Sequence, residues 1–381
     1  MNGWELLAAA EDRAAGEALL AAALSAAGGL PDGPGVVLAS GGSSGRRRWC
    51  LQPRRHLEQS AAASGRWLRQ LGIDPAAVEL VNPLAPHHIG GLMPQVRAQQ
   101  WQVPLLALPP AALKQPALLP RPGAGGRPAL LSLVPTQLGR LLADPEGIAW
   151  LQRFAVIWVG GAGLDAKAAA AARRHGLRLA PCYGATETGA MVTALAPDRF
   201  LAGADGCGPP LDDVELQIST PGAAVAVRTA RLSPGWINGA AGLQPIADDD
   251  GWWCSGDCGR LTADGLVLRG RRDGAVLSGG ETVHPEEVEA ALAGVDGLGA
   301  LLVLGLPDAD WGERLVALIR PGADQALEPL LARLIGAAAA LPPAQRPRQW
   351  LPCAALAPNA QGKWDRAHWR RWARAALRAG R

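Results

Sequence analysis

The sequence predicts an α/β protein, because apolar runs with β propensity alternate along the chain with Ala- and Leu-rich stretches of helical period. We expect strands over 130–135, 154–159 and 177–180, and helices over 58–71 and 165–175. The 381 residues are 49% apolar and 19% charged, which suffices for two or three packed domains and is too apolar for a disordered chain. We therefore expect a soluble globular protein.

The N-terminal segment predicts an amphipathic helix rather than a signal sequence. Residues 1–24 carry Glu5, Glu11 and Asp12 among apolar residues. No uninterrupted apolar run approaches the roughly 18 residues that a membrane span needs. Cysteines occur at positions 50, 182, 207, 254, 258 and 353, without the density or paired spacing of a disulfide framework or a zinc site. These observations favour a cytoplasmic protein.

The rhythm of the chain changes after residue 200. Short alternating runs from about 207 to 246 predict a β-rich subdomain, and 261–269 resembles a hairpin. A helix is expected over 285–292, and a Pro-rich connector over 341–358 precedes a tail helix. We therefore expect an N-terminal domain of mixed sheets and flanking helices over 1–270, with its β-rich subdomain over about 207–270, a hinge over 271–274, and a small α+β domain over 275–381.

The first segment with chemical potential is Ser40-Gly41-Gly42-Ser43-Ser44-Gly45-Arg46-Arg47-Arg48, directly after an apolar run. Glycines let backbone N–H groups face an anion, hydroxyls donate to phosphate oxygens, and arginines supply charge-assisted contacts. The string lacks the Gly-x4-Gly-Lys-Ser/Thr order of a Walker A loop. A phosphate cradle and a flexible Gly/Ser loop with a solvated basic patch both remain open.

The second segment is Tyr183-Gly184-Ala185-Thr186-Glu187-Thr188-Gly189, which holds the chain's single tyrosine. A flat ring can stack on a purine, and a glycine lets a backbone approach phosphates closely. A hydroxyl and a carboxylate follow, and a carboxylate suits a hard cation such as Mg²⁺. The alternative is an ordinary turn with a capping threonine.

Two further residues, Asp257 and Lys363, are candidates for the site because of the residues beside them. Asp257 follows a glycine in Ser255-Gly256-Asp257, so a ribose could approach and give both hydroxyls to the carboxylate. Lys363 stands on a Gly-containing turn, where a mobile point charge can meet a transition-state oxyanion. A plain turn aspartate and a solvated surface lysine are the alternatives.

The order and spacing of these strings resemble the superfamily of adenylate-forming acyl- and aryl-CoA synthetases. The resemblance extends from 38 to 366, and its further strings are Pro83-Leu84 before His88-Ile89-Gly90-Gly91, Gly160-Gly161-Ala162, Gly270-Arg271-Arg272-Asp273, Ser278-Gly279-Gly280-Glu281 and Pro285-Glu286-Glu287-Val288-Glu289. It implies two half-reactions. A carboxylate attacks the α-phosphate of ATP to give an acyl-adenylate and pyrophosphate, and coenzyme A then displaces AMP to form a thioester.

The resemblance also implies roles for individual residues. Tyr183 would stack on adenine, Thr186 would contact the α-phosphate, Glu187 would hold Mg²⁺, and Lys363 would stabilise the transition state of adenylation. The nucleotide would be bound by Ser40, Gly42, Ser43, Ser44, Gly45, Arg48, Gly161, Ala162, Tyr183, Gly184, Asp257 and Arg271. The small domain would be mobile: it would rotate about Asp273, and the loop of Gly279, Gly280 and Glu281 would replace Lys363.

The chain departs from the superfamily in three ways. Its phosphate loop ends in arginines rather than Gly-x-Pro-Lys, Ser255 stands where threonine is common, and the chain is shorter than typical members by something over a hundred residues. Among short members it resembles the 2-succinylbenzoate-CoA ligases of menaquinone and phylloquinone biosynthesis, through 133–138, 88–93 and 278–285. This implies an apolar pocket with cationic or hydroxyl donors for a second carboxylate, and His88, Thr136 and Gly160 are candidates.

Two alternatives remain. A benzoate, fatty acid or other aryl acid could be the substrate. The basic clusters at 46–48 and 370–381 could instead mark a nucleic-acid-binding protein, but a net charge of +3 and the lack of interleaved aromatics argue against it. The expected partners are small molecules, namely ATP, coenzyme A and a carboxylic acid, while the oligomeric state is open.

Overall fold

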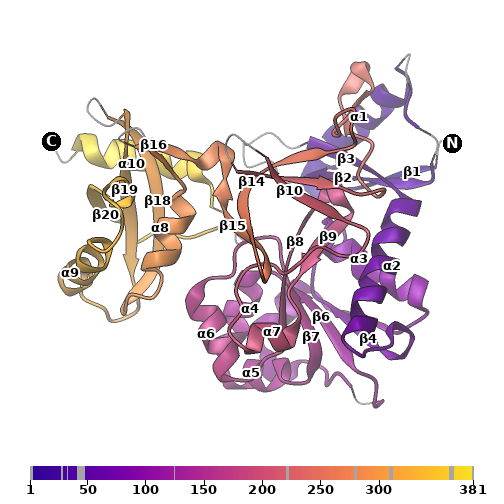
Figure 1. Cartoon of the computed structure of the whole chain (residues 1–381), viewed down its shortest axis with the longest axis horizontal. Coiled ribbons are helices and arrows are strands. Elements are labelled where there is room, and N and C mark those ends of the chain that lie inside the picture. The colour runs from indigo at the N-terminus through magenta and orange to yellow at the C-terminus, as the bar shows by residue number, and fades with distance from the viewer. Residues whose placement is uncertain are drawn as a thin grey trace.

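A computed structural model describes the chain except residues 1–2, 27–28, 32, 41–47, 124, 220–222, 279–280, 309–311, 360–363 and 380–381. Figure 1 shows the elements from β16 onward on one side of the molecule, next to the β14–β15 hairpin, and the earlier elements on the other. None of the described helices combines the length and the apolar composition of a membrane span.

The central sheet has the strand order β5-β4-β6-β7-β8-β9, parallel except for the antiparallel β8–β9 pair. Successive residues point to opposite faces of it, so Leu130 and Val156 belong to one buried cluster while Leu131 and Ile157 belong to another. Both faces are covered by helices, which explains why these strands are almost continuously apolar. The strands are β4 (Glu79–Asn82), β5 (Leu105–Ala107), β6 (Ala129–Leu133), β7 (Phe154–Val159), β8 (Leu179–Ala185) and β9 (Ala190–Ala194).

Helices α2 to α7 lie on the two sides of the central sheet, whereas α1 packs against the sheet that contains β1, β2 and β3 (Figure 1). Trp67 of α2 and Trp101 of α3 pack against one face, and Leu138 of α4 and Trp150 of α5 pack against the other. The helices are α1 (Arg13–Leu24), α2 (Arg54–Gln70), α3 (Ile89–Trp101), α4 (Pro135–Leu142), α5 (Pro145–Leu151), α6 (Ala166–Arg174) and α7 (Pro197–Leu201). The expected helices over 58–71 and 165–175 are confirmed with shifted ends.

A second sheet has the order β1-β2-β3-β12-β13 and a third the order β10-β11-β14-β15. The strands expected from 207 to 246 are therefore divided between two sheets rather than forming one unit. Their bounds are β1 (Trp4–Leu7), β2 (Gly35–Ser40), β3 (Arg48–Pro53), β10 (Glu215–Ser219), β11 (Ala224–Arg228), β12 (Trp236–Ile237), β13 (Leu243–Gln244), β14 (Trp253–Thr262) and β15 (Gly265–Arg271). The hairpin expected over 261–269 is confirmed as the end of the β14–β15 pair.

The prediction of one helix over residues 1–24 is wrong for its first half. Trp4–Leu7 form β1, which pairs in parallel with β2, and the helix begins only at Arg13. The strand forms because Gly35 leaves room for the Trp4 ring: a Cβ at Gly35 would lie 2.2 Å from Trp4 Cζ3. A local pattern does not report such a non-local partner.

The C-terminal elements form a sheet of order β17-β16-β19-β18, with β20 added in parallel to β19. Its two faces carry separate apolar clusters, one beneath α8 and α9 and one beneath α10. The bounds are β16 (Val276–Ser278), β17 (Glu281–Val283), α8 (Pro285–Leu292), β18 (Leu298–Asp308), β19 (Gly312–Pro321), α9 (Leu327–Ala338), β20 (Gln349–Pro352) and α10 (Arg366–Ala379). The helix expected over 285–292 is confirmed, whereas the connector expected over 341–358 contains a strand.

Candidate active site

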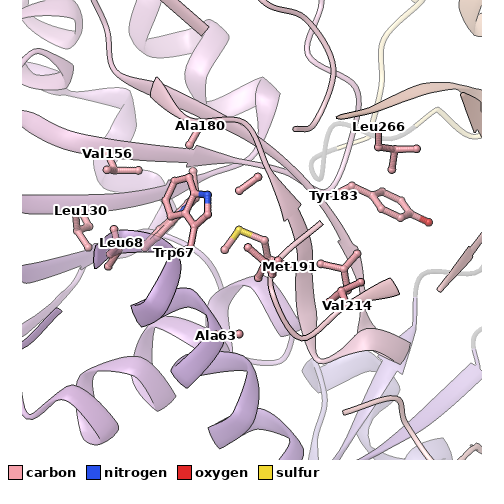
Figure 2. Close-up of a cluster of buried hydrophobic side chains, with 14 of the residues drawn as sticks. Ala63, Trp67, Leu68, Leu130, Val156, Ala180, Tyr183, Met191, Val214 and Leu266 are labelled. Carbon is pink, nitrogen blue, oxygen red and sulfur yellow. The ribbon is translucent and has the colours of Figure 1, made fainter. Parts of the chain in front are cut away.

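The single tyrosine lies at the end of β8, where it joins β14 and β15. The Tyr183 hydroxyl donates to Asp257 Oδ2 (2.8 Å) and lies 3.0 Å from Ser255 Oγ. Figure 2 shows the ring at one end of a buried apolar cluster, beside Leu266, with its hydroxyl directed away from the other labelled side chains. Burial and then the charge of Asp257 raise the pKa of Tyr183, so the phenol stays protonated and donates.

The strand register brings a guanidinium to the same carboxylate. Asp257 of β14 pairs directly with Arg271 of β15, and Arg271 Nη1 donates to Asp257 Oδ1 at 3.1 Å. Arg271 Nε also donates to Asp273 Oδ1 at 3.1 Å. The Arg271 guanidinium lies over Gly256, where an added Cβ would come within 2.3 Å of Nη2. Hydroxyl, carboxylate and guanidinium are thus gathered from three separate segments, and this set can accept from and donate to the hydroxyls of a sugar.

The residues after the tyrosine form a buried turn rather than an open loop. Tyr183 to Ala185 complete β8, and η5 (Thr186–Thr188) follows, with Thr186 and Glu187 only 9% and 8% exposed. Gly184 is required by packing, because a Cβ there would lie 2.1 Å from the Ala190 carbonyl oxygen of β9. The turn therefore has a fixed conformation.

Three side and main chains from elsewhere hold this turn. Gln52 Nε2 donates to the Thr186 carbonyl at 2.5 Å, and the Ser233 amide donates to the Glu187 carbonyl at 2.7 Å. Arg231 is fully buried and donates to the Thr188 carbonyl at 2.6 Å. It also pairs with Asp213 at 2.7 Å. These buried contacts, of which only that of Arg231 is charge-assisted, fix the backbone from which the Thr186 and Glu187 side chains extend.

The carboxylate of Glu187 faces the base of the predicted phosphate loop. Trp236 Nε1 donates to Glu187 Oε1 at 3.0 Å, and the Arg48 guanidinium lies over the Trp236 ring at 4.5 Å from its centroid. Ser40 and Arg48 are register partners at the ends of β2 and β3, so the loop begins and ends here. The predicted phosphate contacts Gly42, Ser43, Ser44 and Gly45 lie outside the described residues.

Glu187 fits a hard cation that is held partly by phosphate. Mg²⁺ usually takes one or two carboxylates and completes its shell with water and substrate oxygens. Within the described part of the chain, no cluster of three or more His, Cys, Asp or Glu could hold a metal by itself. The single carboxylate of Glu187, beside the predicted phosphate loop, matches a Mg²⁺ site whose remaining ligands are water and phosphate oxygens.

The predicted acid-binding residues come after three neighbouring strands of the central sheet, namely β4, β6 and β7. Gly160, Gly161 and Ala162 follow β7, and Gly161 has a φ of +83°, which favours glycine. Thr136 is in the first turn of α4. His88 is exposed at the start of α3, so it is not a core histidine, and its ring lies 4.4 Å from that of His87.

Arg97 is a buried cation that the sequence patterns did not reveal. It is 4% exposed, its Nη2 donates to Ser64 Oγ at 3.0 Å, and its guanidinium lies 4.6 Å from the Trp158 ring centroid. Its Nε and the Trp158 Nε1 are both buried, and neither has a hydrogen-bond acceptor among the described residues. Burial lowers the pKa of Arg97 to about 10, so it stays charged at neutral pH.

This cation is near the residues already described. Burial raises the pKa of the thiol of Cys182, the residue before Tyr183, to about 12, and the nearby charge of Arg97 acts against this rise. Cys182 Sγ donates to the Val159 carbonyl at 3.5 Å, and a Cβ on Gly160 would lie 2.9 Å from the same sulfur. Arg97 lies four positions after Met93 on the buried face of α3, and an arginine on that face is the signal that could have identified it.

The expected hinge and loop residues are only partly described. Asp273 is exposed in η7 (Arg272–Gly274), and Glu281 is exposed at the start of β17. Gly279, Gly280 and Lys363 lie outside the described residues. Their predicted roles in exchanging the two half-reactions stay predictions.

Comparison with known proteins agrees with this geometry. The family model for the AMP-binding enzyme matches residues 41–228. A probable 2-succinylbenzoate-CoA ligase of Mycobacterium tuberculosis is 31% identical over 303 residues, covering 77% of this chain and 72% of the relative. The ligase of Salmonella typhimurium is 34% identical over 189 residues, which are 49% of this chain and only 39% of that relative.

Solved structures show the same fold. The o-succinylbenzoate-CoA synthetase of Bacillus subtilis, in complex with an acyl-adenylate intermediate, superposes with a TM-score of 0.72 at 21% identity over 88% of this chain and 68% of that one. An Escherichia coli counterpart gives 0.70 at 24% identity over 89% and 68%. With the fold, the buried Tyr-Gly-Ala-Thr-Glu turn and the extent of the Mycobacterium match in agreement, the chain belongs to the family of AMP-binding enzymes.

Proposed function

We propose that this protein is an ATP- and Mg²⁺-dependent ligase that converts a carboxylic acid to an acyl-adenylate and transfers the acyl group to coenzyme A. The acid is 2-succinylbenzoate, as the names of the relatives suggest, and the product enters menaquinone or phylloquinone biosynthesis. We place the reaction in the cytoplasm, where free thiols such as the six cysteines of this chain persist.

The hydrogen-bonded group at β8, β14 and β15 supports binding of the nucleoside. Asp257 and Arg271 offer an acceptor and donors to the ribose hydroxyls, and the Tyr183 hydroxyl holds Asp257 in place. Because the tyrosine is 7% exposed, most of its ring surface packs on protein, and its predicted stacking on adenine would use what remains. Gly161 and Ala162 follow β7, close to the Cys182 segment.

Thr186 and Glu187 support the phosphate end. The Thr186 hydroxyl would donate to the α-phosphate, and Ser40 and Arg48 would bind the outgoing pyrophosphate together with the intervening loop. When bound at Glu187, Mg²⁺ would neutralise charge on the phosphate oxygens. The carboxylate attacks the α-phosphorus, the bond to pyrophosphate breaks, and Lys363 would stabilise the charge that develops between them.

Arg97 is the observation that carries the choice of a diacid. Among the described residues the Nε of Arg97 has no hydrogen-bond acceptor, and a buried guanidinium of this kind is costly until a carboxylate accepts from it. The contacts recorded for this guanidinium in the described part of the chain are a hydroxyl and an aromatic ring, neither of them negatively charged. A second, non-reacting carboxylate of the substrate would supply the charge.

Activity measurements with a panel of acids test the proposal. We expect release of AMP and pyrophosphate with 2-succinylbenzoate and coenzyme A, and little with benzoate or a fatty acid. Formation of ADP would refute the reaction, and preference for a monocarboxylic acid would replace the substrate with one of the alternatives.

Variants at Arg97 then test the diacid pocket. Loss of one charge-assisted contact in Arg97→Met should raise the KM for 2-succinylbenzoate by roughly ten- to hundredfold. The KM for ATP should not change. Arg66→Met is the matched control, because Arg66 pairs with Asp212 on the surface with 43% and 40% exposure, where such pairs contribute little. Equal loss of affinity for mono- and dicarboxylic acids in Arg97→Met would contradict the assignment.

A further inference from the structure

We infer that Trp236 is a positioning residue that couples the proposed metal-binding carboxylate of Glu187 to the guanidinium of Arg48 at the start of β3. Its indole holds Glu187 by a hydrogen bond and Arg48 by stacking, so one ring sets the distance between the site of the cation and the site of the pyrophosphate. This inference rests on the proposed binding of Mg²⁺ and ATP, and it concerns a residue outside the motifs from which that function was argued.

The place of Trp236 is fixed by the backbone. It is the first residue of β12, where it pairs with Cys50 of β3, and the Leu51 amide donates to the Gly235 carbonyl at 3.1 Å. A Cβ at Gly235 would lie 2.3 Å from the Gln244 carbonyl oxygen, so only glycine lets β12 approach β13 this closely. The position of the indole is therefore set by the strand pairing as well as by the side-chain rotamer of Trp236.

The same short segment holds both ends of Glu187. The Ser233 amide donates to the Glu187 main-chain carbonyl at 2.7 Å, while Trp236 Nε1 donates to the side-chain Oε1 at 3.0 Å. Glu187 also lies close to β3. Burial and then the charge of Glu187 raise the pKa of the Cys50 thiol in that strand. Because Glu187 is held at its main chain and at its side chain, its carboxylate oxygens have a defined direction.

The chemistry of the indole suits this role. An indole N–H is a neutral donor with no acceptor capacity, so it orients a carboxylate without neutralising the charge that a cation needs. The face of the indole ring is electron-rich and suits the guanidinium of Arg48, because tryptophan is the best aromatic partner for a cation. Arg48 Cζ lies 4.5 Å from the Trp236 ring centroid, within the range of cation–π contacts. Groups that orient metal ligands typically change metal affinity by 10- to 100-fold when removed.

Two substitutions separate the two contacts. Trp236→Phe removes the N–H and keeps a ring for Arg48, whereas Trp236→Leu removes both. Calorimetric titration of Mn²⁺ or Mg²⁺ into the complex with a non-hydrolysable ATP analogue should show about tenfold weaker metal binding in both variants. Affinity for pyrophosphate in the absence of metal should fall only in Trp236→Leu, and affinity for AMP should fall in neither.

A double-mutant cycle tests that the effect passes through the carboxylate. In a Glu187→Gln background, Trp236→Phe should cause no further loss of metal affinity, because the oriented group has gone. If the phenylalanine variant does not fold, judged by its thermal melt, Trp236→His against Trp236→Leu asks the same question, since histidine keeps a ring N–H. We expect the histidine variant to bind metal at least threefold more tightly than the leucine variant.

The outcomes separate this inference from the function on which it rests. Normal metal affinity in Trp236→Phe, with wild-type protein that binds ATP and metal, would overturn the inference alone. Parallel losses for metal and AMP would also overturn it, because they would reveal a merely structural role. Failure of the wild-type protein to bind ATP with or without metal would overturn both.

Discussion

Gly256→Ala should displace Arg271 from the proposed nucleotide site while leaving the fold intact. The added Cβ would lie 2.3 Å from Arg271 Nη2, 2.8 Å from Cζ and 3.1 Å from Nη1. The end of a flexible side chain can move to relieve these clashes, whereas a backbone could not. The 3.1 Å bond between Arg271 and Asp257 would then be lost.

The magnitude follows from the contacts. A hydrogen bond to a charged group contributes about 1.5–3 kcal/mol, so loss of the Arg271 contact with the ribose should weaken AMP binding about ten- to hundredfold. The Arg271–Asp257 pair itself is partly solvated, with 39% and 22% exposure, so the free energy of unfolding should fall by less than about 1 kcal/mol. Isothermal calorimetry with AMP and urea denaturation measure the two quantities.

Gly139→Ala is the matched control. A Cβ at Gly139 meets nothing within 4 Å, and this position lies inside α4, where alanine is favourable. AMP affinity in this variant should equal that of the wild-type protein. Our reasoning would be refuted if Gly256→Ala bound AMP within about threefold of wild type, or if it lost several kcal/mol of stability, which would mean that the strand had moved instead.

The remaining predictions concern stability, pH and the separate half-reactions. Arg231→Met should reduce the free energy of unfolding by about 3–5 kcal/mol in urea denaturation, because it leaves an acidic partner and buried carbonyls unpaired, and a loss under about 1 kcal/mol would contradict this. Burial raises the pKa of Glu289 to about 7, so the folded state binds its proton more tightly than the unfolded state. Stability should therefore fall by up to about 3 kcal/mol as the pH rises from about 4.5 to about 7, and Glu289→Gln should flatten this difference in melts across that range. Lys363→Ala should abolish adenylation in a pyrophosphate-release assay and largely spare thioester formation from supplied acyl-adenylate, and equal loss of both steps would contradict the exchange of loops.

The features that the sequence predicted best are those formed by contiguous residues. Phe154–Val159 form β7 as expected, since a run of apolar residues between two helices has few alternatives. The Tyr-Gly-Ala-Thr-Glu turn was identifiable because its ring, hydroxyl and carboxylate follow each other directly. Even so, Gly184 proved to be needed by the close approach of β9 as well as by any ligand.

What the sequence did not predict depends on pairing between distant segments. Trp236 meets Glu187 only because β12 pairs with β3 in one register, and a shift by one residue would place its side chain on the other face of the sheet. Trp4–Leu7 form a strand only because β2 lies beside them. Arg97 was missed for a different reason: the signal was one arginine among the residues of the buried helix face, and Ser64 and Trp158, which it contacts, come from distant segments.

Arg271 connects the predicted ribose site with the predicted hinge. Its guanidinium bonds Asp257, at the predicted ribose site, and Asp273, the predicted hinge, at the same time. A rotation of the backbone at Asp273 would change the second contact directly and the first through the shared side chain. Since a guanidinium has donors for both carboxylates and for a hydroxyl, bound ribose would compete for the same N–H groups. Nucleotide occupancy and the orientation of the C-terminal domain would then be coupled, and by reciprocity a substitution at Asp273 should alter AMP affinity even though its carboxylate is not expected to touch the nucleotide.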